Sequence, residues 1–366
     1  MSRRGGDGGE SKRPDRPEQG NMFAFYEQAM NRYWEHRSCV WPPSHLSLQS
    51  MYTVGMAAND RNNPINRKAS DSDMTVVEFW REYPDDAACL DRLWRERFAP
   101  DGHHAHCPVC DKERKFHRIK SRASYACDSC GKHLHPMKGT IFEKSTTSLQ
   151  LWFYAMFLMA STRCGISAKQ LERELGVTYK TAWRMFNKIR NELMNDENDG
   201  QLNGKVEVDE TSWGGKPRKK LKRGSEVARW AESRTTVLGM IEREGRVRLR
   251  VIESRRGEPL SGAVRTHVNP AAFMLTDDWP AYKPLRREGY NGATINHSAG
   301  IYVEGDIHTN TIEGFFGNLK TGMRGAYKHV SDRWIQSYLD EFAWRHNARL
   351  EPGGYFEQLL RRAVAI

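Results

Sequence analysis

The spacing of hydrophobic and polar positions changes along this chain, and each spacing predicts a different kind of element. Between Thr146 and Met194 apolar residues recur at every third or fourth position, which predicts three helices. After Gly204 the apolar runs become short and of β type, which predicts strands. The expected strands cover residues 206–211, 235–242, 246–253, 272–275 and 293–297, with a helix at 260–267 and a long helical region at 309–347 broken near Gly325.

The order of the later elements is that of a ribonuclease-H-like α/β domain: three adjacent strands, a helix, two further strands and then helices. Earlier in the chain, near-helical spacing from Thr75 to Phe98 with a break at Pro84 predicts two short helices. Residues 1 to 21 are charged and glycine-rich with almost nothing apolar, so they are expected to form a disordered tail. Residues 22–70 are expected to hold a short helix and a linker.

Charge and composition narrow the class of partner. The 57 Lys and Arg residues exceed the 46 Asp and Glu residues, and the formal net charge of +11 favours a polyanion such as nucleic acid. The longest apolar run, Leu151 to Ala160, has ten residues, about half of what a bilayer span needs, so no membrane segment is expected. The basic N-terminus precedes no apolar stretch, which excludes a secretory signal and predicts a reducing compartment.

Four of the seven cysteines form two closely spaced pairs. Cys107 and Cys110 are separated by two residues, as are Cys127 and Cys130, and sixteen residues lie between the pairs. This spacing is typical of a zinc ribbon, and four thiolates close the coordination shell, so the zinc is expected to be structural. His133 and His135 lie nearby and are interpreted as surface residues.

The segment from Ser167 to Arg184 is typical of a helix, a turn containing glycine and a second helix that Thr178 caps. A helix-turn-helix DNA-binding domain is the favoured interpretation, and a three-helix packing unit with a solvated basic face is the alternative. The second helix is expected to present these residues outward, towards phosphates and base edges: Tyr179, Lys180, Thr181, Arg184, Lys188 and Arg190.

Acidic residues end two of the predicted strands and begin a helix. Alternation in residues 206–211 places Glu207 and Asp209 on one face of a strand, and Asp277 follows the strand at 272–275. Glu313 begins the long helical region, so these carboxylates can converge at one edge of a sheet. Carboxylate oxygens are the ligands that hard divalent cations need.

Thirty-five residues separate Asp277 from Glu313, and Lys320 follows seven residues later on the same helical face. In this spacing the chain resembles the DDE-type transposases and retroviral integrases. It resembles more closely the ISXO2-like insertion-sequence transposases of the IS1595 family, over about residues 72 to 350. The matching segments include residues 84–110, 139–142, 182–184, 206–211, 214–216, 276–277, 296–298, 308–316 and 338–342.

The resemblance implies a DNA transposase that nicks insertion-sequence ends and joins their 3′-OH ends to target DNA. It implies that Asp209, Asp277 and Glu313 hold two Mg²⁺ or Mn²⁺ ions, with Lys320 on a DNA phosphate. The third ligand of the family is Glu or Asn, and Asn310 is also present; the spacing to Lys320 favours Glu313. His308 is a further candidate in the same segment.

Double-stranded DNA, as element ends and target, is the implied partner, with a homo-oligomer in the synaptic complex and a bacterial cytoplasmic, nucleoid-associated location. Between the first two strands, six basic residues in a stretch of eight are expected to contact DNA, although a solvated hairpin is the alternative. These residues are Lys216, Arg218, Lys219, Lys220, Lys222 and Arg223.

We therefore expect a multidomain α+β and α/β protein. Its expected parts are a disordered or partly helical extension (1–70), a short helical segment (71–105), a zinc ribbon (106–144), a helix-turn-helix domain (145–196), a ribonuclease-H-like DDE catalytic domain (203–350) and a C-terminal tail or helix (351–366). Two other functions remain open: a zinc-ribbon and helix-turn-helix regulator with an inactive catalytic domain, and a DNA nuclease without strand transfer.

Overall fold

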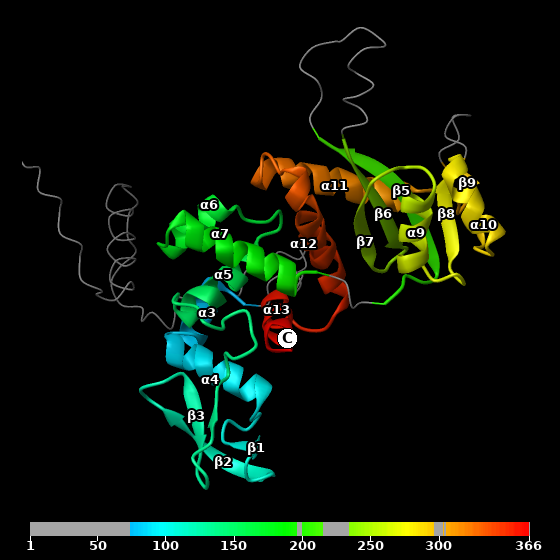
Figure 1. The fold of residues 1–366 in the computed structure, drawn as a ribbon. Helices are drawn as coiled ribbons and strands as arrows, with labels where there is room; N and C mark the ends of the chain where they lie inside the picture. The colour runs from blue at the N-terminus through cyan, green and yellow to red at the C-terminus, as the bar shows by residue number, and fades with distance from the viewer. Residues whose placement is uncertain (1–73, 196–199, 215–233, 296–302, 304, 366) are drawn as a thin grey trace, which may run out of the picture. The chain divides into compact units, whose positions relative to one another are not determined.

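The computed structural model describes residues 74–195, 200–214, 234–295, 303 and 305–365 (Figure 1). These residues all belong to one compact unit, 67–366. The expected tail and linker of residues 1–70 lie outside the described residues, as does the basic stretch 216–223. Within the parts of the chain that the structure describes, none of the helices has the length and apolar character that crossing a membrane requires.

Two helices and a small sheet come first. The helices are α3 (Val76–Glu82) and α4 (Asp86–Arg97), as the break at Pro84 predicted, and the strands are β1 (His104–Cys107), β2 (Lys112–Ile119), β3 (Ser124–Cys127) and β4 (His133–Leu134). The strands pair in chain order and antiparallel. The Trp94 indole of α4 stacks on Tyr125 of β3 with 4.1 Å between ring centres, so α4 forms part of the core of this sheet.

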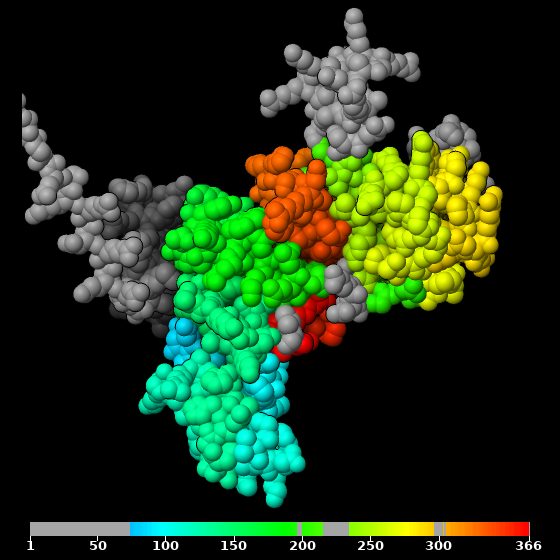
Figure 2. Space-filling view, in the orientation of Figure 1, coloured from blue at the N-terminus to red at the C-terminus, as the bar shows by residue number. Residues whose placement is uncertain are grey.

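A block of three helices follows, as predicted. It consists of α5 (Leu149–Ser161), α6 (Ala168–Leu175) and α7 (Tyr179–Lys188), and a π-helical turn η1 (Ile189–Leu193) extends α7. Gly176 ends α6 in the left-handed conformation with φ of 63°, which glycine adopts without steric cost. The predicted cap is confirmed, because the Thr178 side chain accepts a hydrogen bond from the Thr181 N–H. In the space-filling view, the green surface of α6 and α7 faces the viewer (Figure 2).

The prediction that Arg190 points outward is wrong. Its side chain is fully buried, and its guanidinium lies 3.7 Å from the ring centre of Phe186 and 3.6 Å from that of Tyr338. Arg190 follows the buried Phe186 by four residues, so both side chains lie on the buried face of the helix. The arginine is tolerated there because the Nε atom binds the carboxylate of Glu341 at 3.0 Å.

The second sheet has five strands in the order β7-β6-β5-β8-β9. Strands β5, β6 and β7 pair antiparallel, whereas β8 and β9 run parallel to β5. Strand β6 has the predicted bounds, and the ends of the others differ from the prediction by one or two residues. The bounds are β5 (Lys205–Trp213), β6 (Thr235–Glu242), β7 (Val247–Ile252), β8 (Phe273–Asp277) and β9 (Gly292–Ile295).

Helices and helical turns connect and cover these strands. Between β7 and β9 lie α9, η2 and α10, and the long helical region after β9 breaks just past Ala326, close to the predicted position. The elements are α9 (Glu258–His267), η2 (Pro280–Tyr282), α10 (Lys283–Arg287), α11 (Asn310–Ala326), η4 (Asp332–Trp334), α12 (Ile335–Asn347), η5 (Ala348–Leu350) and α13 (Tyr355–Val364).

The two faces of the five-stranded sheet belong to different core clusters. Val206, Val208 and Leu238 pack with α9 in the smaller cluster, and we call this side the α9 face. Val237 and Ile241 pack with α11 and α12 in the larger cluster, on the side that we call the α11 face. Alternate residues of each strand therefore point to α9 and to α11.

Helix α11 approaches the sheet closely at Gly239 of β6. A Cβ atom at this glycine would lie 2.5 Å from Cζ of Phe316 and 2.8 Å from Cδ1 of Ile312. Any larger residue would push α11 away from β5 and β6. The glycine thus sets the distance between the helix and the strand to which Asp209 belongs, since Gly239 pairs with Asp209.

Helix α12 covers the open edge of β7 through two amide side chains. Asn347 accepts from the Val247 N–H at 2.8 Å and donates to the Val247 carbonyl at 3.0 Å. Gln336 accepts from the Val251 N–H at 2.8 Å and donates to the Leu249 carbonyl at 2.9 Å. These bonds satisfy backbone groups that an edge strand would otherwise expose to pairing.

The carboxylate of Glu341 on α12 is fully buried and joins several helices. It binds Arg190 at 3.0 Å and Arg345 at 2.8 Å, and it accepts a hydrogen bond from the Tyr327 hydroxyl. Arg345 also donates to the carbonyls of Met159 and, at 2.6 Å, Thr162, at the end of α5. Burial raises the pKa of Glu341, but the two arginines outweigh it and hold the pKa below the usual value.

Replacing this carboxylate tests its contribution to stability. We expect Glu341→Gln to lower the free energy of unfolding by about 3 kcal/mol, because two buried arginines lose their counter-charge. Urea unfolding at neutral pH measures the effect, with the exposed Glu351→Gln as a matched control.

The wild type and Glu341→Gln also test how the free energy of unfolding depends on pH. A depressed pKa stabilises the folded state above the unfolded value and ceases to do so as the pH falls through the folded value. The difference between wild type and Glu341→Gln should therefore narrow below about pH 4.3. A difference that stays constant down to the acid transition would contradict the charge assignment.

Candidate zinc ribbon and catalytic site

The structure brings the four paired cysteines together. All four Sγ atoms lie within 4.8 Å of one another, with 3.5 Å between those of Cys107 and Cys130 and 4.0 Å between those of Cys110 and Cys127. A tetrahedral zinc ion with Zn–S bonds of about 2.3 Å spaces its sulfurs by about 3.8 Å. The donor set and its spacing therefore fit a closed structural zinc site.

The two cysteine pairs lie on equivalent turns. The N–H of Asp111 donates to the Cys107 carbonyl at 2.8 Å, and the N–H of Gly131 donates to the Cys127 carbonyl at 3.1 Å. Asp111 and Gly131 both adopt a positive φ, of 52° and 70°. Aspartate and glycine are among the residues that tolerate this conformation, so the residue after each pair allows the turn that presents two sulfurs to one point.

The nearby histidines lie outside the sulfur cluster. Nδ1 of His133 lies 3.1 Å from Oγ of Ser124, and His135 is exposed. Neither belongs to the group of ligand atoms that the four cysteines form.

Asp209 and Asp277 lie on the neighbouring parallel strands β5 and β8. The pairing of these strands runs as far as Glu207 and Leu275, and Asp209 and Asp277 each follow two residues later on their strand. Alternation along the strands places both residues on the α11 face, because Val208, next to Asp209, and Met274, three residues before Asp277, belong to the α9 face.

Glu313 and Asn310, the two candidates for a third ligand, both lie in the first turn of α11 and are exposed. Thr309 precedes the helix and donates from Oγ1 to Oε1 of Glu313 at 3.0 Å. Across the described residues, the four cysteines are the group whose potential ligand atoms lie within 4.8 Å, so Asp209, Asp277 and Glu313 are not that close together. Two ions about 3.5 to 4 Å apart are held by carboxylates on different sides of the pair. The ligand atoms of such a site therefore need not all lie within 4.8 Å of one another.

Lys320 lies two turns after Glu313 on α11. Its Nζ atom is 6.0 Å from the ring centre of Phe316. Burial lowers the pKa of Lys320, Arg324 lowers it further, and Asp209 opposes both. Asp209 is thus among the charged groups that influence the pKa of Lys320.

Glu207 has a role that the sequence interpretation did not assign. It is fully buried, and its Oε2 accepts hydrogen bonds from the N–H groups of Thr311 at 2.9 Å and Ile312 at 3.0 Å. The Thr309 side chain makes no such bond, so a carboxylate of β5 caps the N-terminus of α11. Only its position two residues before Asp209, on the same buried face, could have indicated this.

The cap also explains His308. Nδ1 of His308 lies 3.3 Å from Oε1 of Glu207, and Arg243 binds the same oxygen at 2.9 Å. Arg243 further donates to the His308 carbonyl at 3.1 Å. These contacts place His308 in the structure that holds α11 on β5.

Glu210 is a second residue without an assigned role. It accepts a hydrogen bond from the buried Tyr282 hydroxyl on the α9 face. Burial raises the pKa of Glu210 to about 7; the Tyr282 hydrogen bond opposes this, while Asp277 and Asp209 add to it. An acidic residue at an inward position of a strand was the available signal.

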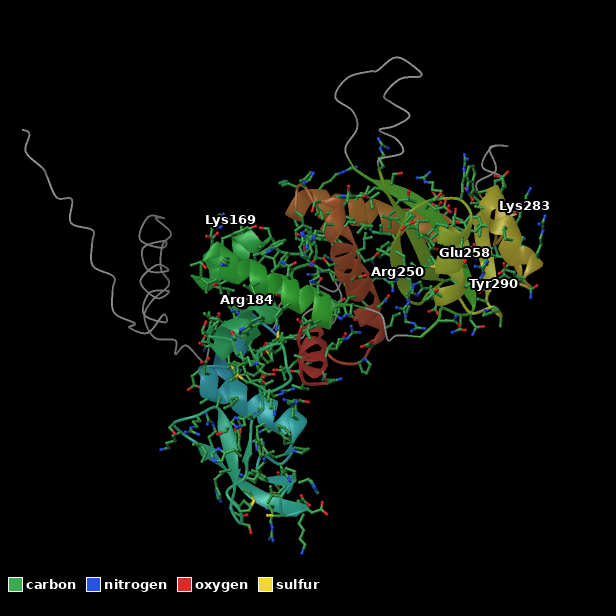
Figure 3. The ribbon with its side chains drawn as sticks, in the orientation of Figure 1. Lys169, Arg184, Arg250, Glu258, Lys283 and Tyr290 are labelled. Atoms are coloured by element: carbon green, nitrogen blue, oxygen red, sulfur yellow. The ribbon has the colours of Figure 1, made fainter. Side chains whose placement is uncertain are left out.

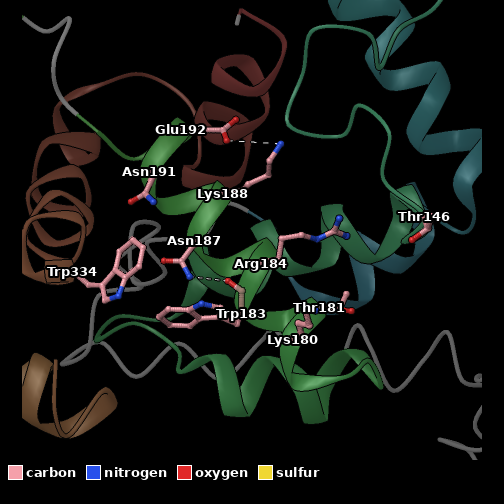
Figure 4. A pocket seen from close by; sticks show the side chains of 10 residues that line it. All are labelled: Thr146, Lys180, Thr181, Trp183, Arg184, Asn187, Lys188, Asn191, Glu192 and Trp334. Carbon is pink, nitrogen blue, oxygen red and sulfur yellow. Dashed lines mark hydrogen bonds and ion pairs between the residues drawn. The ribbon is translucent and has the colours of Figure 1, made fainter. Parts of the chain in front are cut away.

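The outward face of α7 lines a hollow of about 630 Å³ (Figure 4). Lys180, Thr181, Arg184 and Lys188 line it, whereas Tyr179 lies at a second hollow with Lys169. Figure 3 labels Lys169 and Arg184 on α6 and α7. The sequence interpretation missed Trp334, which belongs to η4 and contacts Trp183 with 6.1 Å between ring centres. The remaining lining residues are Thr146, Trp183, Asn187, Asn191 and Glu192.

Comparison with known proteins agrees with this architecture. Residues 201–347 match the family model of the ISXO2-like transposase domain, and residues 84–133 match that of the transposase zinc-ribbon domain. A relative from Halobacterium salinarum, described as an uncharacterized protein in transposable element ISH50, is 27% identical over 274 residues. That similarity covers 68% of this chain and 87% of the relative.

The zinc assignment makes a direct prediction. Freshly purified protein should contain one zinc ion per chain by elemental analysis, and Cys127→Ser should lose it, because three thiolates and a hydroxyl bind zinc far less tightly. Cys164→Ser changes an exposed cysteine outside the cluster and should keep the metal. Zinc-free wild-type protein would refute the assignment.

Proposed function

The chain belongs to the ISXO2-like transposases of the IS1595 family, and on that premise we propose that it nicks insertion-sequence ends and joins them to target DNA. The observation that carries this proposal is that Asp209 and Asp277 each follow, two residues later, the paired Glu207 and Leu275 of two adjacent parallel strands. The strand order β7-β6-β5-β8-β9, with three antiparallel and two parallel strands, supports a ribonuclease-H-like fold for this domain.

The proposed metal ligands are Asp209, Asp277 and Glu313, whose oxygens suit Mg²⁺ or Mn²⁺. When bound, a pair of such ions activates the attacking oxygen and stabilises the leaving oxygen. Glu207 fixes the start of α11 on β5, so it orients Glu313 relative to Asp209. Lys320 would hold a DNA phosphate beside these carboxylates.

The proposed reaction has two phosphoryl transfers. Water first attacks the phosphorus at the element end, and the broken bond releases a 3′-OH. That hydroxyl then attacks a target phosphate and displaces a target 3′-oxygen, so each step exchanges one P–O bond for another. No external energy source is needed for the joining step.

The helices α6 and α7 are proposed to bind double-stranded DNA as a helix-turn-helix. The hollow along α7 gathers Lys180, Arg184 and Lys188, and Thr181 lies among them, so phosphate and base-edge contacts can come from one face. Lys188 is also within 3.8 Å of Glu192, which limits its reach. A homo-oligomer that pairs two element ends is part of the proposal.

The first experiment compares the effects of replacing Asp277 and its neighbour Asp278 on nicking and strand transfer. Asp277→Asn should abolish nicking of a duplex that carries the terminal DNA of the chain's own element, because a neutral amide binds a divalent ion poorly. It should also abolish strand transfer from a pre-nicked end, while DNA binding persists. Asp278→Asn alters an exposed neighbouring carboxylate and should retain activity. If the wild-type protein nicks DNA without strand transfer, the protein is a nuclease. If Asp277→Asn is as active as Asp278→Asn, Asp277 is not a metal ligand and the site is refuted.

The second experiment decides the third ligand. Glu313→Gln should abolish nicking and strand transfer, because it removes a full charge next to two cations. Asn310→Ala changes a residue in the same helical turn and should leave measurable activity. If Glu313→Gln is active and Asn310→Ala is inactive, the third ligand is Asn310.

A further inference from the structure

Trp279 contacts Asp277 of the proposed catalytic site and is partly exposed to solvent. Its N–H donates to Oδ1 of Asp277 at 3.1 Å, and its indole Nε1 donates to the Arg255 carbonyl at 3.1 Å. The side chain nevertheless remains 37% exposed. Two hydrogen bonds thus fix a large aromatic residue beside Asp277 while leaving part of it open to a ligand.

Two arginines accompany this indole. The Arg256 guanidinium lies 6.0 Å from the Trp279 ring centre, at the limit of a cation–π contact. Arg255 donates to Oγ of Ser212 at 2.7 Å, at the end of the strand to which Asp209 belongs. Both arginines are exposed, so a ligand can reach both of them and the indole.

The charge of Arg255 also reaches the carboxylate site. Burial raises the pKa of Glu210, and Arg255 is among the groups that oppose that rise. Arg255 also acts on Lys320, whose pKa burial lowers and Arg255 lowers further. The geometric link to the aspartates is the bond of Arg255 to Ser212, which lies three residues after Asp209 on β5.

An exposed indole next to guanidinium groups suits a flat ligand that bears a negative charge. A nucleotide has both properties, because every base offers a face for stacking and every phosphate an anion. A base inside a duplex is already stacked on its neighbours, and removing it costs a few kcal/mol, whereas an unpaired base avoids most of that cost. The arrangement therefore favours unpaired over paired DNA.

We propose that Trp279, Arg255 and Arg256 form a subsite that stacks an unpaired base of the DNA strand next to the phosphate at Asp277. This inference rests on the proposed function, since it takes DNA as the substrate. It adds a requirement for local unpairing near the reacting phosphate. The Trp279 N–H donates a hydrogen bond to Asp277. A base stacked on the Trp279 indole would therefore position the adjoining phosphate at the carboxylates.

The test uses the full-length, zinc-loaded chain and three short fluorescent duplexes of the same mixed sequence. One is fully paired, one has an unpaired stretch, and one has abasic sites within that stretch. Wild-type protein should bind the unpaired probe at least about fivefold more tightly than the paired one, which is the lower end of base–aromatic stacking. The abasic probe should lose this preference.

Trp279→Ala should abolish the preference and leave the affinity for the paired duplex unchanged, whereas Trp279→Phe should keep most of it. Phe273→Ala, at the other end of β8, removes another exposed aromatic side chain and should keep the preference in full. A preference that survives Trp279→Ala overturns the subsite. Equal binding of all probes by the wild type overturns it while leaving the proposed function intact, and absence of DNA binding overturns both.

Discussion

The arrangement of the helices around the five-stranded sheet depends on the buried charge of Glu341. A carboxylate without solvent is costly unless cations and hydrogen bonds surround it, and here Arg190, Arg345 and Tyr327 do so. These partners come from three places in the chain: the end of the helical block, α12 itself and the end of α11. Gly165 fits beside them because a Cβ atom there would collide with the Tyr327 hydroxyl. The charge therefore constrains the helical block and α12 together, and α12 in turn covers the edge of β7.

Glu207 repeats the same principle nearer to the proposed site. Strand β5 carries Glu207 and Asp209 on one face, yet the two residues serve different needs. Glu207 is buried, caps α11 and binds Arg243, so it contributes geometry. Asp209 lies two residues further along the strand, beyond the last pairing of β5 with the strand that ends at Asp277. One alternating pattern thus supplies both the support of α11 and a proposed ligand, and Gly239 lets the helix approach closely enough for both.

Local signals predicted most of the elements, and contacts between distant residues explain what was missed. Residues 235–242 were predicted with the bounds of β6, and Thr178 was identified as a cap, because periodicity and capping depend on neighbours in sequence. Arg190 was expected to be outside, since its burial requires Glu341, which lies 151 residues away. The partner of Glu207 on α11 lies 104 residues away, and nothing near Glu207 in the sequence identifies it.

Electrostatics in the proposed site impose opposite requirements on its centre and its rim. Carboxylates that bind divalent ions repel DNA phosphates, so the substrate needs cations close to them. In the proposed function Lys320 on α11 and Arg255 after β7 would meet this need: Asp209 acts on Lys320, Arg255 acts on Glu210 next to Asp209, and both cations remain at least partly exposed. Arg190, Arg345 and Arg243 instead neutralise the buried Glu341 and Glu207. The cations named here therefore fall into two groups: arginines that neutralise buried carboxylates and hold the fold, and exposed cations that are available to DNA in the proposed function.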